Sequence, residues 1–218
     1  WWPSRARTCE EAGAGRNSSV FRLAPWRTFL SSLTLITPKR FADARGWFAE
    51  TYQRDRFRAG LVDADFVQDN QSFSAPAFTL RGIHFQTPPH AQAKLVRCLR
   101  GRIWDVAVDL RAGSPTYGRW VGAELTAERG EQLYVPAGFG HGFLTLEPDC
   151  EVAYKTSDFY APDCDAGLAW DDPDLGIAWP LPPGRTPELS HKDGRQPRFN
   201  DFVSPFAYDG RPLEPLDI

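Results

Sequence analysis

The chain has 218 residues, of which 42% are hydrophobic, and this is enough to bury one full core without a second domain. Its formal net charge of −3, with both signs interspersed, provides no basic stripe for nucleic acid. No apolar run approaches membrane-spanning length and the first residues lack a signal-peptide pattern, so we expect a cytoplasmic protein that binds neither nucleic acid nor membrane.

Both ends of the chain differ in composition from its middle. Residues 1–30 begin with Trp1 and Trp2 instead of methionine and contain a stretch rich in Gly, Ala, Arg and Ser. This composition predicts a leader that is disordered or not native to the protein. The tail from about Pro197 is rich in Pro, Gly and Asp, which predicts irregular structure packed over the domain. We therefore expect a single domain over residues 31–218, including a C-terminal extension.

Between these ends, short runs of alternating apolar and polar residues are separated by Gly and Pro turn signals. Only residues 54–60 indicate a helix. Regular spacing of short strands is typical of an antiparallel sandwich or jelly roll, whose mouth can hold a small ligand. The sequence therefore predicts an all-β jelly-roll barrel. The expected strands cover residues 33–37, 47–52, 66–73, 78–86, 94–100, 102–110, 119–126, 132–135, 142–147 and 152–156.

The cysteines give no sign of cross-linking. Cys9, Cys98, Cys150 and Cys164 include no C-x-x-C pair and lie in dissimilar contexts. Neither a disulfide framework nor a zinc site is indicated, so we expect free thiols.

Ionisable side chains gather on three consecutive expected strands between residues 80 and 109. On residues 102–110, an apolar series that begins at Trp104 alternates with Asp105, Ala107 and Asp109. One face therefore packs, while the other is polar and is either an ordinary half-exposed sheet or the lining of a pocket. The ionisable group comprises Arg81, His84, Lys94, Arg97, Asp105 and Asp109.

One segment places a histidine directly after a Pro-Gly turn. From Gly130 to His141, it resembles the second metal motif of the cupin superfamily, which supports a cupin-type jelly roll. That motif ends in Asn where this chain has Thr145, and the first cupin motif needs His-x-His followed by Glu where this chain has only His84. Two imidazoles without a suitably placed carboxylate are too few ligands, so we expect no metal. His141 either contacts substrate or has a backbone partner at a turn.

Eight short motifs occur in order at residues 46–50, 66–70, 80–86, 94–98, 105–109, 136–143, 154–156 and 190–193. Together they closely resemble the dTDP-4-dehydrorhamnose 3,5-epimerase family. The resemblance covers about residues 33–193. It implies a cofactor-free homodimeric epimerase that inverts the 3- and 5-carbons of dTDP-4-dehydro-6-deoxy-D-glucose to give dTDP-4-dehydro-L-rhamnose.

The resemblance also implies residue roles. The family's general base matches His84, its aspartate partner matches Asp193, and the opposing acid matches Tyr154. Tyr160 matches the aromatic residue that stacks on thymine. The family usually has glutamate where this chain has Ala44 and Asp165, and these changes concern nucleotide contacts only. The remaining nucleotide- or sugar-binding positions match Arg45, Glu50, Gln68, Asn70, Arg81, Lys94, His141, Asp165 and Lys192.

The chemistry of epimerisation makes independent sense of these residue types. Removing a proton beside a ketone requires a base with a pKa near neutral, which histidine provides, and a carboxylate on its second nitrogen fixes the tautomer. The enolate that forms is negatively charged, so Lys94 is the leading partner for its oxygen. Inversion needs a proton from the opposite face, and the phenol of Tyr154 can supply it.

The positions of Arg81 and His84 conflict with a regular strand. Residues three apart on a strand point to opposite faces, although both residues are expected at the site. Either Gly82 marks a bulge that redirects one of them, or Arg81 reaches the site of a neighbouring subunit. The second alternative, with the family resemblance, predicts a homodimer whose sites share residues.

Other functions remain open. A relative that inverts only one carbon would use the same residues. A metal-dependent cupin enzyme would need more ligands than His84 and His141. A non-catalytic binder of sugar nucleotides would be expected to lack the base, and the presence of both His84 and Tyr154 argues against it.

Overall fold

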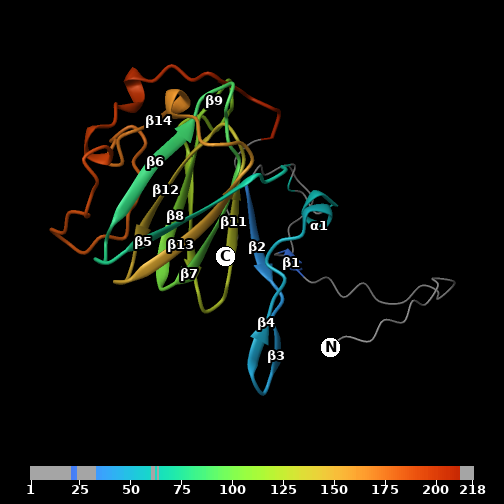
Figure 1. The fold of residues 1–218 in the computed structure, drawn as a ribbon. Helices are drawn as coiled ribbons and strands as arrows, with labels where there is room; N and C mark the ends of the chain where they lie inside the picture. Colours follow the sequence, from blue (N-terminus) through green and yellow to red (C-terminus); the bar gives the residue numbers. More distant parts are fainter. Residues whose placement is uncertain (1–20, 24–32, 60–61, 63, 212–218) are drawn as a thin grey trace.

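The computed structural model describes residues 21–23, 33–59, 62 and 64–211, which form mainly antiparallel β-strands (Figure 1). The helical segments are α1 (Arg54–Ala59), η1 (Pro162–Cys164), η2 (Asp193–Arg195) and η3 (Phe199–Asp201). The strands are β1 (Phe21–Leu23), β2 (Thr34–Pro38), β3 (Phe41–Asp43), β4 (Gly46–Phe48), β5 (Gln68–Ser74), β6 (Leu80–Gln86), β7 (Lys94–Arg100), β8 (Arg102–Asp109), β9 (Arg111–Ala112), β10 (Trp120–Thr126), β11 (Gln132–Val135), β12 (Phe139–Thr145), β13 (Cys150–Thr156), β14 (Asp165–Gly167) and β15 (Phe206–Ala207).

Two sheets face each other across a shared apolar core. One has six strands in the order β1-β2-β11-β7-β13-β5, and the other has five in the order β10-β8-β12-β6-β14. Val96 and Leu133 of the first sheet pack with Ile103 and Phe143 of the second. The predicted all-β jelly-roll architecture is confirmed. Within the described residues, no helix has the length and apolar character needed to span a bilayer.

Several expected elements differ from the observed ones. The expected strands 94–100 and 132–135 coincide with β7 and β11. The expected strand 47–52 is wrong, because residues 46–48 instead pair with 41–43 in a separate hairpin closed by a two-residue turn. Strand β12 begins at Phe139 and not at residue 142, since its glycines are covered by Ile83 and remain in the sheet. Strands β9, β14 and β15 contain only two or three residues, too few to show a pattern.

Parts of the predicted leader and tail lie outside the described residues. These parts are residues 1–20, 24–32 and 212–218, and they include Cys9. Inside the predicted leader, β1 pairs antiparallel with β2, with Phe21 opposite Pro38. The single domain over residues 31–218 stays a prediction.

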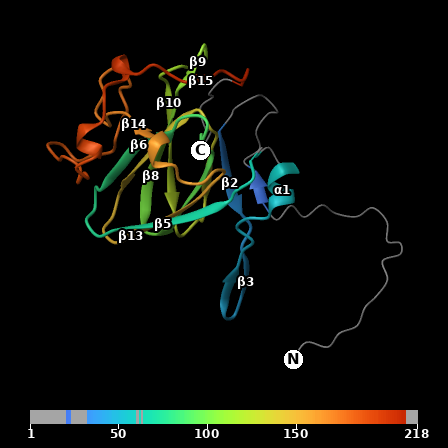
Figure 2. The ribbon, with the colours of Figure 1, turned by 45° about the horizontal axis from the view of Figure 1, so that its top comes forward.

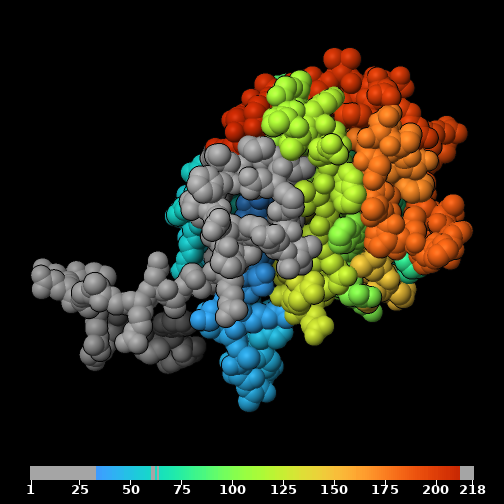
Figure 3. All heavy atoms as spheres, turned by 180° about the vertical axis from the view of Figure 1, so that it is seen from behind, coloured from blue at the N-terminus to red at the C-terminus, as the bar shows by residue number. Residues whose placement is uncertain are grey.

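Strand β8 is buried on both faces. Asp105 and Ala107 point into the barrel and are fully buried, while Val106 and Val108 pack outward. The half-exposed alternative for this strand is therefore wrong. The outward face is covered by residues that follow β14, among them Leu168 and Phe206, and Figures 2 and 3 show this C-terminal part in orange and red over one side of the barrel.

Arg111 links the end of this C-terminal segment to the barrel through hydrogen bonds. Its buried guanidinium donates to both carboxylate oxygens of Asp109, at 2.9 and 2.8 Å, and to Asp209 at 2.7 Å. It also lies over the ring of Phe139, 4.4 Å from the centroid. Burial alone would raise the pKa of Asp109, but the hydrogen bonds from Arg111 and its neighbours outweigh it and hold that pKa low.

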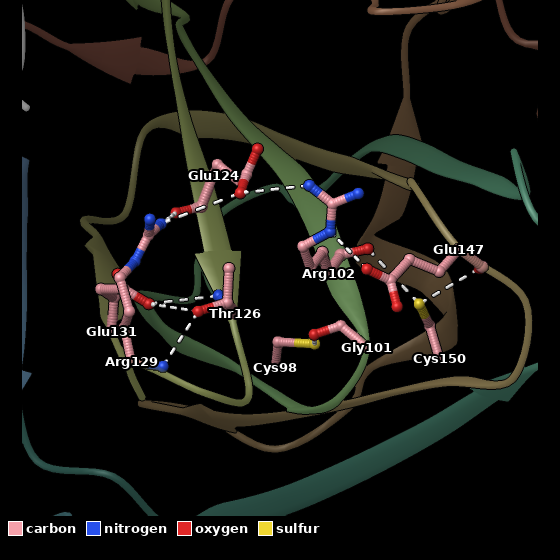
Figure 4. Close-up of polar contacts among 9 residues, drawn as sticks. All are labelled: Cys98, Gly101, Arg102, Glu124, Thr126, Arg129, Glu131, Glu147 and Cys150. Atoms are coloured by element: carbon pink, nitrogen blue, oxygen red, sulfur yellow. Dashed lines mark hydrogen bonds and ion pairs between the residues drawn. The ribbon is translucent and has the colours of Figure 1, made fainter.

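Ion pairs cluster at the barrel end where β7 turns into β8 (Figure 4). Arg102 pairs with Glu147 and with Glu124, the latter at 3.6 Å. Arg129 pairs with the buried carboxylate of Glu131. Glu131 also accepts hydrogen bonds from the backbone nitrogen of Thr126 at 3.1 Å and from its hydroxyl at 3.3 Å. The buried charge is thus paired and hydrogen-bonded, as burial requires.

Two buried thiols hold the backbone of the same turn. The Sγ of Cys98 donates to the carbonyls of Arg100 and Gly101, each at 3.2 Å. The Sγ of Cys150 donates to the carbonyl of Arg102 at 3.4 Å. Burial raises the pKa of Cys98 to about 12, so this thiol is inert. The prediction of free thiols is confirmed for Cys98, Cys150 and Cys164.

Strand β6 contains a bulge at Gly82. His141 of β12 pairs with His84, but Phe143 pairs with Arg81, so two β6 residues oppose one β12 residue. Gly82 has φ of +141°, and a Cβ there would lie 2.4 Å from the Cα of Gly142. Only glycine fits both the backbone angle and the contact. The bulge shifts the alternation, so Ile83 and Phe85 point outward, while His84 lines the interior cavity and Arg81 bonds to Ser74 and Phe73 of β5.

Replacing Gly82 with alanine is expected to lower the free energy of unfolding by about 3 kcal/mol, because it adds overpacking to an unfavourable φ. Gly113→Ala is the matched control. Its φ is +84° and a Cβ there meets nothing within 4 Å, so it is expected to lose only about 1 kcal/mol. Urea unfolding of both variants measures the difference, and equal losses would contradict the close approach to Gly142.

Candidate active site

His84 and Asp193 form a hydrogen-bonded pair, although they lie far apart in the sequence. The Nε2 of His84 bonds to the Oδ1 of Asp193, which the η2 turn brings against β6. Ser190 donates to the other carboxylate oxygen at 2.8 Å and accepts from the Asp193 backbone nitrogen at 3.0 Å. Asp193 is 4% exposed, and burial would raise its pKa, but the bond from His84 and the nearby charges hold that pKa below its ordinary value. Asp193 therefore stays ionised and can orient the imidazole.

His84 lines the cavity and has a second ring nitrogen that the bond to Asp193 does not use. Because Nε2 is bonded to a carboxylate, a neutral His84 has its proton on Nε2 and a free lone pair on Nδ1. Among the described residues, Nδ1 has no hydrogen-bond partner. The ring is about one-third exposed and lines a cavity of about 320 Å³, so Nδ1 can accept a proton from a bound molecule.

Lys94 begins β7 and points into the same cavity. Its Nζ donates to the backbone carbonyl of His84 at 3.2 Å, and the residue is 9% exposed. Burial lowers the pKa of Lys94 to about 8, although the charges of Asp105 and Asp165 act in the opposite direction. Lys94 is thus a cation in a water-poor site, suited to offset a developing negative charge.

His141 is paired with Asp105 behind the cavity. Its Nε2 bonds to Asp105 Oδ1 at 2.8 Å, and both side chains are buried. Burial lowers the pKa of His141 despite the opposing effect of Asp105, so the ring is neutral and donates to the carboxylate. The expected backbone partner for His141 is therefore replaced by a carboxylate. The second oxygen of Asp105 is buried and has no partner among the described residues.

Tyr154 faces the cavity from the six-stranded sheet, whereas His84 faces it from the five-stranded sheet. Burial raises the pKa of Tyr154, an effect that the positive charge of Arg81 partly offsets, so the phenol stays protonated at neutral pH. Arg81 reaches this region because of the Gly82 bulge, and its Nη2 donates to the carbonyl of Phe73 at 3.1 Å. The predicted bulge at Gly82 is confirmed, whereas the alternative that Arg81 reaches the site of a neighbouring subunit stays a prediction.

Most of the predicted residues meet at this cavity. Tyr160 and Lys192 both bond to the Oδ2 of Asp165, Tyr160 at 3.0 Å. The Gln68 amide donates to Asn70 at 2.9 Å. The predicted residues that line the cavity are Gln68, Asn70, His84, Lys94, Tyr154, Tyr160, Asp165 and Lys192.

Four predicted binding residues do not line this cavity, namely Arg81 and His141, whose contacts are given above, and Arg45 and Glu50. Arg45 is at the tip of the β3–β4 hairpin, where its 90% exposed side chain pairs with Asp43. Glu50 follows the same hairpin and pairs with Arg56 at 2.7 Å. Within one copy of the chain, neither lines the cavity around His84.

The structure also identifies site residues to which the sequence assigned no role. Asp105 supports His141, and its position on the alternating strand was the signal that could have identified it. Ser190 supports Asp193, and Gln86 and Gln92 line the cavity. In the part of the chain that the structure describes, no three His, Cys, Asp or Glu side chains are grouped as metal ligands.

Comparison with known proteins agrees with the motifs. The chain matches the dTDP-4-dehydrorhamnose 3,5-epimerase family over residues 27–201. An enzyme of that name from Sinorhizobium fredii is 50% identical over 179 residues, which cover 82% of this chain and 91% of the relative. The crystal structure of a dTDP-6-deoxy-D-glucose-3,5-epimerase from Legionella pneumophila, in complex with dTDP-4-keto-L-rhamnose, has a TM-score of 0.80 and 39% identity, covering 87% of this chain and 100% of that one. A 3'-monoepimerase from Streptomyces bikiniensis, in complex with dTDP-quinovose, has a TM-score of 0.71 and 38% identity, covering 78% of this chain and 84% of that one.

Lys94→Met is expected to raise the free energy of unfolding at pH 7 by about 2 kcal/mol, because it removes a charge whose burial is unfavourable. The pKa of Lys94 is about 8 in the folded protein and 10.5 ordinarily, so the unfolded chain binds the proton more tightly. Wild-type stability therefore rises between pH 8 and 10.5, and the advantage of methionine shrinks over that range. Urea unfolding at pH 7 and pH 10 measures this, with the exposed Lys39→Met as control. A destabilised Lys94→Met protein at pH 7 would contradict the stated effect of burial.

Proposed function

This chain belongs to the dTDP-4-dehydrorhamnose 3,5-epimerase family, and from that premise we propose how the residues around its cavity perform the epimerisation. The enzyme is an isomerase that inverts the 3- and 5-carbons of dTDP-4-dehydro-6-deoxy-D-glucose to give dTDP-4-dehydro-L-rhamnose. The observation that supports the residue roles best is the placement of His84 and Tyr154 on opposing sheets across one cavity.

His84 is the proposed general base. Its Nδ1 removes the proton from the carbon beside the ketone, and the bond from Nε2 to the ionised Asp193 stabilises the imidazolium that results. The two electrons of the broken C–H bond become the enolate, whose charge develops on the former keto oxygen. Lys94, protonated below a pKa of about 8, is the proposed partner of that oxygen.

Tyr154 is the proposed acid. Its phenol delivers a proton to the enolate carbon from the side opposite His84, which inverts the configuration. The raised pKa of Tyr154 keeps the phenol protonated before the step. His141, neutral and with Nε2 bonded to Asp105, has a lone pair on Nδ1 that can accept a hydrogen bond from a sugar hydroxyl.

The nucleotide is proposed to bind at the rim of the cavity. The ring of Tyr160 is exposed there, as a surface that stacks on thymine must be, and Gln68 and Asn70 offer amide groups beside it. Lys192 and Arg81 provide positive charge for the diphosphate. Asp165 receives bonds from both Tyr160 and Lys192, so the shorter acid in place of glutamate still links these two groups.

We further propose that the enzyme is a homodimer in which the β3–β4 hairpin of one copy reaches the cavity of the other. The hairpin projects from the body of the protein (Figures 1 and 3). Its Trp47 and Phe48 are 58% and 70% exposed, and a two-stranded hairpin is marginally stable unless it packs against something. Arg45 and Glu50, which match nucleotide-binding positions, flank these rings. A second copy would bury the rings and bring Arg45 to a nucleotide.

Substitutions of His84 and Tyr154 separate proton removal from inversion. In deuterated water, His84→Ala is expected to abolish both deuterium uptake and product, because no enolate forms. Tyr154→Phe leaves the base in place, so deuterium still enters the substrate from the same face while inversion falls steeply. Mass spectrometry and proton NMR of the sugar count both events at each carbon, which also distinguishes this enzyme from a mono-epimerase. Wild-type inversion in Tyr154→Phe would mean that another residue is the acid.

Hybrid dimers test the shared site. His84→Ala and Arg45→Ala are expected to be nearly inactive alone, but a mixture refolded together should regain about a quarter of wild-type activity. In the hybrid, the copy with an intact His84 receives Arg45 from its partner, and half of the dimers each have one such site. No recovery beyond the sum of the two variants would place Arg45 and His84 of one copy in the same site. As a control for the dimer itself, the mass of the Phe48→Asp variant is measured by light scattering. This variant places a charge in the proposed interface and should have the mass of a monomer.

A further inference from the structure

We propose that Gln86 is a positioning residue that fixes the rim of the nucleotide site by holding the backbone of residues 158–161. This inference rests on the proposed binding of the thymine base at Tyr160. Gln86 ends β6, two residues after His84, and is 4% exposed. It does not touch the reacting carbons in the proposed mechanism and acts through Tyr160.

The side-chain amide of Gln86 joins two loops. Its Nε2 donates to the carbonyls of His90 at 2.7 Å and Phe159 at 3.1 Å. Its Oε1 accepts from the backbone nitrogen of Ala161 at 2.8 Å. The amide thus binds the residues directly before and after Tyr160, with both donor hydrogens and the oxygen in use.

Three other polar side chains bind the same backbone segment, and together with Gln86 they form what we call the clamp: Gln68, Gln92 and Thr156. Gln68 accepts from the backbone nitrogen of Tyr160 at 3.1 Å. Gln92 and Thr156 donate to the carbonyl of Asp158 at 2.7 and 2.9 Å. The backbone of residues 158–161 is therefore held by amides and hydroxyls that belong to β5, β6, β13 and the loop before β7.

The aromatic rings of this segment have little support of their own. Phe159 is 63% exposed and Tyr160 is 58% exposed. The only hydrogen bond of the Tyr160 side chain in the described structure joins its hydroxyl to Asp165. Since packing does not fix the ring, its position depends on the backbone, and Gln86 holds that backbone on both sides of Tyr160.

The chemistry of the clamp requires an amide at position 86. Glutamate has the same length and keeps the acceptor for Ala161, but it replaces the donor with a carboxylate oxygen that repels the carbonyls of His90 and Phe159. Because the site is buried, water cannot supply the missing donors. Gln86→Glu is thus a conservative change in shape that breaks the clamp.

Gln86→Glu should raise the KM for the sugar nucleotide about tenfold while kcat changes less than about twofold, since His84, Asp193 and Tyr154 keep their contacts. The affinity for dTDP should fall about tenfold, whereas the affinity for 2-deoxyribose 5-diphosphate, which lacks the base, should not change. Calorimetry with these two probes gives the comparison. Gln53→Glu, at a half-exposed side chain outside the cavity, is the matched control and should behave as wild type.

A double-mutant cycle tests whether Gln86 acts through Tyr160. Tyr160→Ala should weaken dTDP binding, and adding Gln86→Glu to it should weaken binding no further. Additive losses, a fall in kcat without a rise in KM, or equal losses for both probes would overturn the proposal. If Gln86→Glu does not fold, Gln86→Met removes all three hydrogen bonds of the amide without adding charge and is judged by the same criteria. Wild-type protein that fails to bind dTDP would refute the nucleotide site itself, a result distinct from failure of the clamp.

Discussion

The five-stranded sheet must be covered on both faces, and this requirement links the fold to the chemistry. Val106, Val108 and Ile83 face outward from β8 and β6, and they become buried only when the chain after β14 packs over them with Leu168 and Phe206. Burial of each such side chain contributes about 1.5–3 kcal/mol. The covering segment passes the end of β6, and there it brings Asp193 to His84. The segment that completes the core therefore also completes the His84–Asp193 pair.

Charge is distributed unequally along the barrel interior. The middle is apolar, with Leu133, Ala107 and Val152 in contact. Toward the cavity, the neutral His141 separates Asp105 from solvent, and the positive charge of Lys94 is retained in spite of burial. An unpartnered carboxylate oxygen and a buried ammonium are unfavourable for folding, and such groups concentrate where transition-state charge must be stabilised.

Much of the fold could be predicted from the composition of its strands, and much of the site from the combination of its motifs. Strands β7 and β11 are short runs rich in apolar residues between turn signals, and the motif residues around His84, Lys94 and Tyr154 are specific in combination. The hairpin at residues 41–48 could not be predicted, since its pairing depends on a turn. Its aromatic residues are typical of a buried strand, although their rings are exposed in the structure. The roles of Asp105 and Gln86 could not be assigned because their partners, His141 and the backbone near Tyr160, are distant in sequence and adjacent only in the fold.

The contacts at the two ends of the barrel span different lengths of sequence. At the end where β7 turns into β8, Cys98 bonds to carbonyls two and three residues away, and Arg102 pairs with Glu147, 45 residues further along. At the open end, His84 meets a carboxylate 109 residues further along. Closing a long loop is slower and entropically more costly than forming a turn. His84 therefore precedes its partner carboxylate by 109 residues during synthesis, so a chain that ends before Asp193 contains the base without the group that orients it.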